Sequence, residues 1–269
     1  MELGLRGRKA LVTGASKGIG RACAEVLAEE GCDVVLVSRT AADLEAARAA
    51  IVAKHNVAVR FYPLDLSDSR NVDRLAAECA ETDLLVNNAG AIPGGDIALV
   101  DEARWRTAWD LKVFGYINMT RRFYALMAQR KKGVIVNILG AAGENPDFDY
   151  IAGSSGNASL MAFTRAMGGT APRDGLRVVG INPGSGHDRP ARQFDAHPRA
   201  DAIRRRRAMD RVHEAARLRA RRQARGDRLD GSLPRFGQIG LHHGFDHHDR
   251  WWRLEPALGV LIGPDDSGG

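Results

Sequence analysis

The stretch Ala10-Leu11-Val12-Thr13-Gly14-Ala15-Ser16-Lys17-Gly18-Ile19-Gly20 joins a short apolar run to a helical pattern through a turn rich in glycine. This order predicts a strand, a tight turn and a helix whose N-terminal N–H groups face a phosphate. We expect Gly14 to allow the turn, Gly18 to leave room for a pyrophosphate, and Gly20 to let the helix pack closely. The stretch therefore predicts a dinucleotide site near the start of the chain.

Strand-like runs and helical patterns alternate along the sequence up to residue 181. The strand-like runs are short and rich in β-branched residues, which is typical of buried parallel strands. They cover residues 10–12, 33–37, 57–61, 83–86, 133–138 and 176–181. The helical patterns cover residues 20–30, 41–54, 69–80, 103–130 and 157–171. Strands separated by helices form βαβ units, so we expect an α/β fold with a doubly wound parallel sheet in three layers.

Four motifs occur in the order that a known family has. They are residues 13–20, Asp65-Leu66 after the third strand, Asn87-Asn88-Ala89-Gly90 after the fourth, and Asn182-Pro183-Gly184 after the sixth. On these motifs, residues 1–184 resemble the short-chain dehydrogenase/reductase family. The resemblance implies an NAD(P)-binding Rossmann fold that moves hydride between a nicotinamide and a small alcohol or carbonyl substrate. It also implies a homodimer or homotetramer, in which the helices at residues 103–130 and 157–171 often meet a second copy.

The residues that end the second strand bear on which dinucleotide binds. A carboxylate there would bond the 2′-hydroxyl of NAD and repel the 2′-phosphate of NADP, but this chain has Ser38-Arg39. Arg39 can pair with a phosphate, and Lys17 in the glycine turn can reach the same group. We therefore expect NADP(H), with NAD as the alternative. The competing interpretation is that both cations are solvated surface residues.

The cofactor-binding residues expected from the motifs and the resemblance are Gly14, Ser16, Lys17, Gly18, Ile19, Gly20, Ser38, Arg39, Asp65, Leu66, Asn88, Ala89, Gly90, Pro183 and Gly184. By resemblance, Asp65 and Leu66 border the adenine. Asn88 and Gly90 support the adenosine and ribose side.

The positions that carry catalysis in the family hold other residues here. Family members use a tyrosine as proton donor, a lysine four residues later, a serine that polarises the carbonyl, and an asparagine that anchors a water relay. Aligned on residues 160–165, this chain has Gly153 at the tyrosine and Asn157 at the lysine. Leu139-Gly140 stands where paired serines are expected, and Lys112 replaces the asparagine.

Tyr150 and Lys112 are our candidates for the missing catalytic groups. Tyr150 lies three residues before Gly153, about one helical turn away if the helix begins that early. A phenol with a pKa of about 10 needs a cation to act near neutral pH. We expect Lys112 to supply it, in space left by Asn157. The competing interpretation makes Tyr150 a loop residue and Lys112 a surface cation.

Two serines near the start of the same helical pattern bear on the missing serine. Ser154 and Ser155 offer replacement hydroxyls. Serines in this position are also favoured helix caps, and we prefer that interpretation.

Composition bears on the class of protein. The 269 residues carry a net charge of +6 and are 44% hydrophobic, which allows one substantial core. The sequence starts without a secretory pattern and contains no run long enough to span a bilayer, so we expect a soluble cytoplasmic protein that does not enter membranes. Cys23, Cys32 and Cys79 show no metal-ligand spacing and predict neither a disulfide framework nor a metal site.

The last part of the sequence differs from the first. Residues 185–269 hold about 17 arginines and roughly 12 acidic residues, and they show almost no apolar periodicity. A nucleic-acid arm, or a metal site in the His/Asp cluster at residues 242–249, is a weak interpretation because neither has a supporting motif. We favour a frameshift near Gly184. Read one nucleotide later, suitable codons for residues 221–229 and 244–252 give the Pro-Glu-Glu-Ile-Ala helix and the last strand of the family.

The sequence as a whole predicts an NADP(H)-preferring oxidoreductase. The alternative is a catalytically silent NAD(P)-binding relative with a regulatory or interaction role, because several active-site positions are changed. A chain that carries residues 185–269 as written would lack the last strand and much of the substrate pocket.

Overall fold

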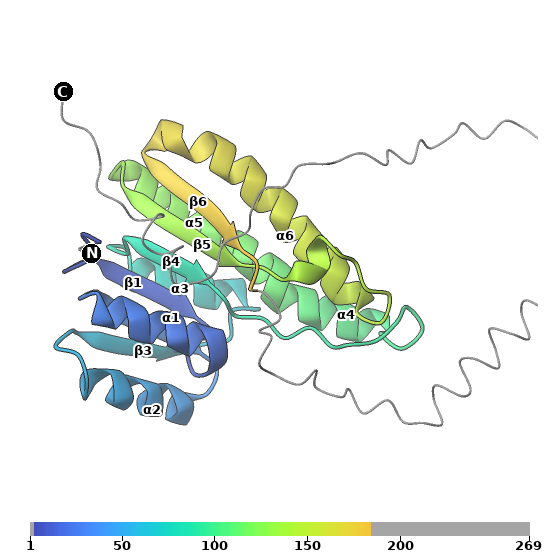
Figure 1. Cartoon of the computed structure of the whole chain (residues 1–269), viewed down its shortest axis with the longest axis horizontal. Helices are drawn as coiled ribbons and strands as arrows, with labels where there is room; N and C mark the ends of the chain where they lie inside the picture. Colours follow the sequence, from blue (N-terminus) through green and yellow to red (C-terminus); the bar gives the residue numbers. More distant parts are fainter. Residues whose placement is uncertain (1–2, 184–269) are drawn as a thin grey trace, which may run out of the picture. The chain divides into compact units, whose positions relative to one another are not determined.

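Six parallel strands form one sheet in the computed structural model, which describes residues 3–183 (Figure 1). The strands are β1 (Lys9–Thr13), β2 (Asp33–Ser38), β3 (Val59–Pro63), β4 (Leu84–Asn87), β5 (Gly133–Ile138) and β6 (Leu176–Ile181). Their order is β3-β2-β1-β4-β5-β6, so the strand order reverses between β1 and β4. This order confirms the predicted doubly wound parallel sheet. The predicted boundary at residue 184 and the predicted unit 185–269 lie outside the described residues.

Helices cover both faces of the sheet and give three layers (Figure 1). α1 (Gly18–Glu29) and α2 (Ala41–Val52) pack on one face, while α3 (Ser69–Glu78) and α5 (Gly115–Gln129) pack on the other. Successive strand residues serve opposite cores, since Leu11 is buried on the α3–α5 face and Val12 on the α1–α2 face. Because both faces are covered, most residues of the central strands are buried and apolar, and Thr13, Asn87 and Asn137 are the buried polar exceptions in β1, β4 and β5.

The third strand lies two residues later than predicted. Val34 pairs with Val59 and Ser38 with Pro63. Ala58 instead bonds through its N–H to the Asp33 carboxylate at 2.9 Å, just before the ladder begins. Periodicity alone does not reveal this register, because the pairing with the neighbouring strand sets where β3 begins and ends.

The helix predicted at residues 103–130 is interrupted. α4 (Glu102–Trp109) runs into a π-helical turn at Asp110–Phe114 before α5 begins at Gly115. π-helical turns are rare and are frequent at functional sites. This one carries Lys112. A single π-turn hardly changes the apolar periodicity of a helix. The sequence therefore does not distinguish this interrupted helix from a continuous α-helix.

The last helix, α6 (Ile151–Thr170), begins six residues earlier than predicted. The prediction was wrong because Gly153-Ser154-Ser155-Gly156 has low helix propensity, which tertiary contacts override here. The indole Nε1 of Trp109 donates to Ala152 O at 3.0 Å and packs against the helix at Gly156. Tyr150, not a serine, directly precedes the first helical turn.

The carboxyl ends of β1 and β4 are tied together. Thr13 Oγ1 accepts hydrogen bonds from the N–H groups of Asn88 (2.9 Å) and Ala89 (3.0 Å), and it donates to Val86 O at 3.3 Å. Asn88 Nδ2 in turn donates to Thr13 O at 3.0 Å. These bonds hold the glycine turn against the loop after β4, at the reversal of strand order where such sheets bind ligands.

A buried polar network joins the central strands to two helices. Asn87 Nδ2 donates to Asn137 Oδ1 at 2.9 Å and to Thr120 Oγ1 at 3.2 Å. Asn137 Nδ2 donates to Thr164 Oγ1 at 2.9 Å. All four side chains are buried. Since buried polar groups are stable only with correct partners, the network fixes α5 and α6 relative to β4 and β5.

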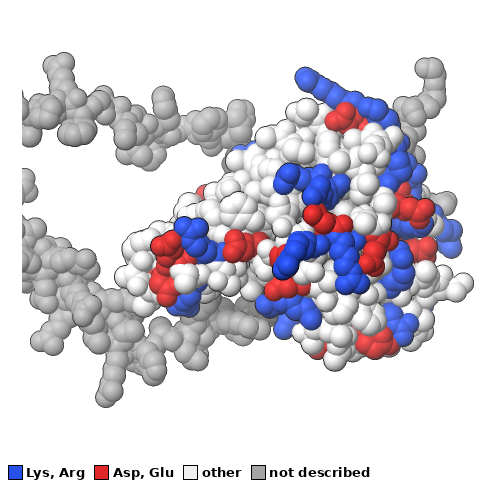
Figure 2. Space-filling view, turned by 180° about the vertical axis from the view of Figure 1, so that it is seen from behind, with Lys and Arg blue, Asp and Glu red and all other residues white. Residues whose placement is uncertain are grey.

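Basic and acidic side chains are intermixed on the face shown in Figure 2. Among the described residues, ion pairs such as Arg48–Glu45 (2.6 Å) and Arg74–Glu78 (2.7 Å) join neighbours on one helix. Exposed pairs of this kind add little stability. None of the helices within residues 3–183 combines the length and hydropathy that a bilayer crossing requires. In the same residues, His, Cys, Asp and Glu side chains form no group of three suited to a metal ion.

Candidate functional site

A cleft of about 410 Å³ opens beyond the carboxyl ends of β1, β2 and β4. Ten of the predicted cofactor residues line it, namely Gly14, Ser16, Lys17, Ile19, Ser38, Arg39, Leu66, Asn88, Ala89 and Gly90. The other lining residues, which sequence reasoning did not identify, are Val37, Thr40, Asp43, Leu64, Ala91 and Leu111. Gly18, Gly20, Asp65 and Pro183 do not line the cleft. Gly184 lies outside the described residues.

The glycines of the first turn contribute in different ways. Gly14 and Gly18 have φ values of 66° and 59°, in the left-handed region that favours glycine. The space where a side chain at Gly18 would lie is open. A Cβ at Gly20 would overlap Gly14 O and Asn88 Nδ2. Gly20 therefore lets α1 approach both the turn and the loop after β4.

The N-terminus of α1 is suited to a phosphate. Lys17 precedes the helix, and its side chain makes no capping hydrogen bond. The first N–H groups of a helix lack partners within the helix, and the helix dipole favours a negative group there. The pyrophosphate of a dinucleotide is such a group, so this end of the cleft fits the predicted cofactor.

Two cations and an unpartnered hydroxyl line the cleft: Lys17 before α1, and Ser38 and Arg39 at the end of β2. Lys17 and Arg39 are exposed and line the cleft, and within residues 3–183 no ion pair joins either one to an acid. Ser38 Oγ is buried without a hydrogen-bond partner. Asp43, in the first turn of α2, lines the same cleft with the opposite charge. A bound phosphate would satisfy Ser38 and both cations, with Asp43 opposing it.

Asp65 and Leu66 have separate roles in the structure. The Asp65 carboxylate accepts hydrogen bonds from Ser67 N (3.0 Å) and Ser67 Oγ (2.8 Å). Asn71 Nδ2 donates to Asp65 O at 2.8 Å. Asp65 therefore shapes its own loop, and its contact with a base stays a prediction. Leu66 is buried and lines the cleft, where its side chain can contact a flat ring.

The ring of Tyr150 lies over Gly153. A Cβ at Gly153 would overlap the Cε1 and Cζ atoms of that ring, so the phenol fills the volume of a side chain at position 153. Tyr150 is half-buried, and burial raises the pKa of its hydroxyl. The phenol is therefore protonated near neutral pH, as a proton donor must be.

Lys112 is buried rather than a surface cation, with 8% of its area exposed. Its Nζ donates to Tyr116 Oη at 2.8 Å and to Ile138 O at 2.7 Å, and Tyr116 Oη donates to the same carbonyl at 2.9 Å. A Cβ at Gly90 would overlap the Lys112 stem. Burial lowers the pKa of Lys112 to about 7. Within residues 3–183 no hydrogen bond joins it to Tyr150, so their electrostatic pairing stays a prediction.

The Asn157 side chain lies beside Gly140, at the position where the family has its serine. A Cβ at Gly140 would come within 2.7 Å of Asn157 Nδ2. That nitrogen donates to Gly153 O at 2.9 Å, whereas Asn157 Oδ1 is buried and unpartnered. Both polar atoms of the Asn182 side chain are also buried without partners.

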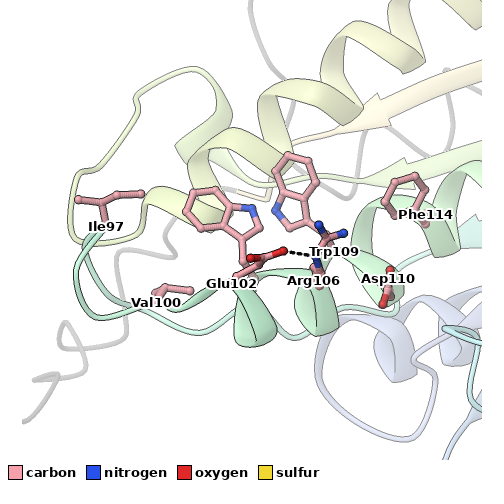
Figure 3. A pocket seen from close by; sticks show the side chains of 8 residues that line it. Ile97, Val100, Glu102, Arg106, Trp109, Asp110 and Phe114 are labelled. Atoms are coloured by element: carbon pink, nitrogen blue, oxygen red, sulfur yellow. Dashed lines mark hydrogen bonds and ion pairs between the residues drawn. The ribbon is translucent and has the colours of Figure 1, made fainter.

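A second hollow, of about 610 Å³, lies along α4 (Figure 3). Two tryptophan rings with centroids 6.1 Å apart form part of its wall, beside the Glu102–Arg106 ion pair of 2.8 Å. The remaining lining residues are Ile97, Val100, Asp110 and Phe114. This hollow is distinct from the cofactor cleft, and sequence reasoning did not identify it.

Thr13 and Tyr116 also hold the site together, and sequence reasoning gave neither of them a role. Tyr116 follows Lys112 by four residues, a spacing that places two side chains on one helical face and was available as a signal. Thr13 precedes the first glycine of the turn. Its role depends on the position of the loop after β4, and the sequence around Thr13 does not predict that position.

Comparisons with known proteins agree with this geometry. Residues 8–192 match the family model described as short chain dehydrogenase. The chain is 30% identical over 186 residues to 2,3-dihydro-2,3-dihydroxybenzoate dehydrogenase of Bacillus subtilis, covering 68% of this chain and 71% of that protein. It is 33% identical over 189 residues to galactitol 2-dehydrogenase of Rhizobium johnstonii, covering 66% and 72%. The solved L-sorbose reductase of Gluconobacter frateurii, complexed with NADPH and L-sorbose, superimposes with a TM-score of 0.65 at 30% identity, covering 68% and 72%.

We expect Lys112→Met to alter the pH dependence of stability. The pKa of Lys112 is about 7 in the folded protein, against 10.5 for the free side chain. Between these values the unfolded chain binds more protons, so this group makes the wild type more stable as the pH rises. The unfolding free energy of wild type minus that of the variant should rise by about 1 kcal/mol per pH unit between about pH 7 and 9.

Urea unfolding at several pH values measures this difference. The exposed Lys54→Met variant is the control, and its difference from wild type should stay constant over the same range. A constant difference for Lys112→Met as well would contradict a neutral buried amine.

Proposed function

We propose, because the chain belongs to the short chain dehydrogenase family and is an oxidoreductase, that it prefers NADP(H) and moves hydride between the nicotinamide and an alcohol or carbonyl substrate. The observation that carries the cofactor preference is that the residues at the end of β2 are Ser38 and Arg39 and not a carboxylate. Lys17, Arg39 and the unpartnered Ser38 hydroxyl line the same cleft, and folds of this type recognise the adenosine ribose at the end of the second strand, which supports the preference. The L-sorbose reductase noted above was solved with NADPH.

The proposed mechanism uses Tyr150 as the proton donor. When bound, NADPH supplies the hydride. The Tyr150 phenol, protonated because burial raises its pKa, gives its proton to the substrate oxygen as the carbonyl is reduced, and it regains a proton from solvent. Its place over Gly153 supports this role, because the phenol fills the space of the family's tyrosine position.

Lys112 supplies positive charge to this site in the proposal. Its hydrogen bonds go to Tyr116 and Ile138, so the charge acts on the Tyr150 phenolate through space. A buried amine whose pKa is near neutrality is easily shifted between its two protonation states. Protonated Lys112 stabilises the phenolate that forms when Tyr150 has donated its proton.

The second candidate is a silent NAD(P)-binding protein with a regulatory or interaction role. The observation that favours it is the loss of side chains at Gly140 and Gly153 together with the amide at Asn157. NADPH oxidation with a panel of ketones, aldehydes and quinones distinguishes the two candidates. Turnover by the folded protein supports the reductase, whereas tight NADPH binding without turnover supports the silent protein.

Oligomer formation through the face that carries α4 is part of the proposal. Large apolar side chains are exposed around the second hollow, at Ile97 (59%), Leu99 (51%) and Phe114 (51%). Exposed apolar residues gathered in one region are typical of an interface. We propose that a second copy covers them. Cytoplasmic location, the absence of nucleic-acid binding and the frameshift near Gly184 stay predictions.

Arg39→Ala tests the cofactor preference. Loss of a charged partner for the 2′-phosphate should weaken NADPH binding by about 30-fold and NADH binding by less than about threefold. Fluorescence titration measures both, with Arg48→Ala, in the helix that follows Arg39 but outside the cleft, as control. An equal loss for the two dinucleotides would contradict a 2′-phosphate contact.

Tyr150→Phe and Gly153→Ala test the proton donor. Removing the hydroxyl, or displacing the ring with a Cβ, should lower kcat by about 100-fold or more while NADPH binding is kept. Gly169→Ala in the same helix meets open space and should retain full turnover. Unchanged kcat in Tyr150→Phe would exclude this phenol as the donor.

Phe114→Glu tests the interface. A carboxylate in an apolar contact carries a desolvation penalty, so the variant should elute as a smaller species in size exclusion with light scattering. Val52→Glu, at an exposed apolar residue of α2, should leave the assembly unchanged. A monomeric wild type, or an unaffected Phe114→Glu oligomer, would contradict the proposed face.

A further inference from the structure

Asp43 is a charged residue of the cofactor cleft that the proposed function leaves unused. It lies in the first turn of α2, is exposed, and lines the cleft together with Ser38, Arg39 and Thr40. Among the described residues that line the cleft, it is the one acid. Within residues 3–183 its carboxylate has no ion-pair or hydrogen-bond partner, so it is available to a bound ligand.

The path of the chain places this carboxylate beside one of the predicted phosphate contacts. β2 ends at Ser38, Arg39 follows it, and α2 begins two residues after Arg39. The first helical bond of α2 joins Leu44 N to Thr40 O at 3.2 Å. Asp43 thus lies in the turn that directly follows Arg39. The acid and one of the two cations therefore border the same end of the cleft.

The other acids near the cleft do not take this position. The Asp65 carboxylate accepts hydrogen bonds from Ser67 at 2.8 and 3.0 Å, and Asp65 does not line the cleft. Folds of this type that bind NAD use an acid at the end of the second strand to bond the ribose, whereas this strand ends in Ser38 and Arg39. The acid that borders this end of the cleft comes from α2 instead.

The two dinucleotides differ only at the 2′ position of the adenosine ribose. NAD(H) has a hydroxyl there, which can donate a hydrogen bond to a carboxylate. NADP(H) has a phosphate, which offers acceptor oxygens and carries close to two negative charges. Lys17 and Arg39 favour the phosphate, while Asp43 favours the hydroxyl. The cleft thus holds a partner for either group.

We infer that Asp43 is a specificity-determining residue, which accepts a hydrogen bond from the 2′-hydroxyl of NAD(H) and repels the 2′-phosphate of NADP(H). Asp43 narrows the preference for NADP(H) that Lys17 and Arg39 create, so the chain binds both dinucleotides. This inference rests on the proposed function, because it takes the cleft as the dinucleotide site.

Asp43→Asn and Asp43→Ala separate the two effects. Asparagine keeps an acceptor without the charge, so Asp43→Asn should bind NADPH about tenfold more tightly at low salt, while its NADH affinity changes less than about threefold. Alanine also removes the acceptor, so Asp43→Ala should show a similar gain for NADPH and lose about tenfold for NADH. Fluorescence titration of the full chain with each dinucleotide measures these affinities.

Glu45→Gln is the matched control. Glu45 is an acid of the same helix that does not line the cleft and pairs with Arg48 at 2.6 Å. Because its charge is directed to Arg48 and not to the cleft, Glu45→Gln should leave both affinities within about twofold of wild type.

Salt provides a readout that a merely structural role for Asp43 would not change. The Debye length shortens from about 10 Å at 0.1 M to about 3 Å at 1 M salt. The gain in NADPH affinity of Asp43→Asn over wild type should therefore fall below about threefold at 1 M salt. A gain that is the same at both salt concentrations would contradict repulsion by the carboxylate and overturn the inference.

The same titrations separate failure of this inference from failure of the proposed function. Unchanged NADPH affinity in both Asp43 variants, or unchanged NADH affinity in Asp43→Ala, would overturn the inference. A wild type that binds NADH more tightly than NADPH contradicts the proposed cofactor preference, while the expected shifts in the variants still support the role of Asp43. A wild type that binds neither dinucleotide overturns both.

Discussion

The hydrogen bonds between Thr13 and the loop after β4 are the contact on which the cofactor cleft depends. Thr13 Oγ1 accepts from two backbone N–H groups of that loop, and Asn88 returns a bond to Thr13 O. These bonds close the gap at the reversal of strand order, and they bring Asn88 near enough to the first turn that Gly14 and Gly20 have no room for side chains. The N-terminus of α1 is held beside the cleft as a result.

At three other glycines, neighbouring side chains occupy the space that a side chain on the glycine would fill. Lys112 passes over Gly90, the Asn157 amide lies beside Gly140, and the Tyr150 ring lies over Gly153. At each place a side chain on the glycine would collide with the polar residue that now occupies the space. The changes at positions 140, 153 and 157 are therefore coupled, and each substitution is understandable only together with its neighbour.

The buried polar side chains near the site differ in how they are stabilised. The network from Asn87 through Asn137 to Thr164 is hydrogen-bonded along its length and anchors α6 to the sheet. Lys112, by contrast, is buried, and the loss of hydration disfavours its charged form and lowers its pKa, although Tyr116 Oη and Ile138 O accept its hydrogen bonds. The π-helical turn brings Lys112 and Tyr116 onto the same carbonyl.

The sequence by itself determined the fold and the phosphate end of the cleft. Apolar runs separated by helical patterns specify a parallel sheet, because strands covered on both faces are apolar throughout. The glycine spacing at residues 14–20 specifies the turn, because glycine readily adopts the left-handed backbone of Gly14 and Gly18, and Gly20 leaves no room for a side chain. The start of α6, the π-helical turn and the bond of Lys112 to Ile138 followed only from the tertiary structure. These features arise from contacts between segments distant in sequence, such as Trp109 with Ala152 and Lys112 with Ile138, which outweigh local propensity and leave no periodic signal.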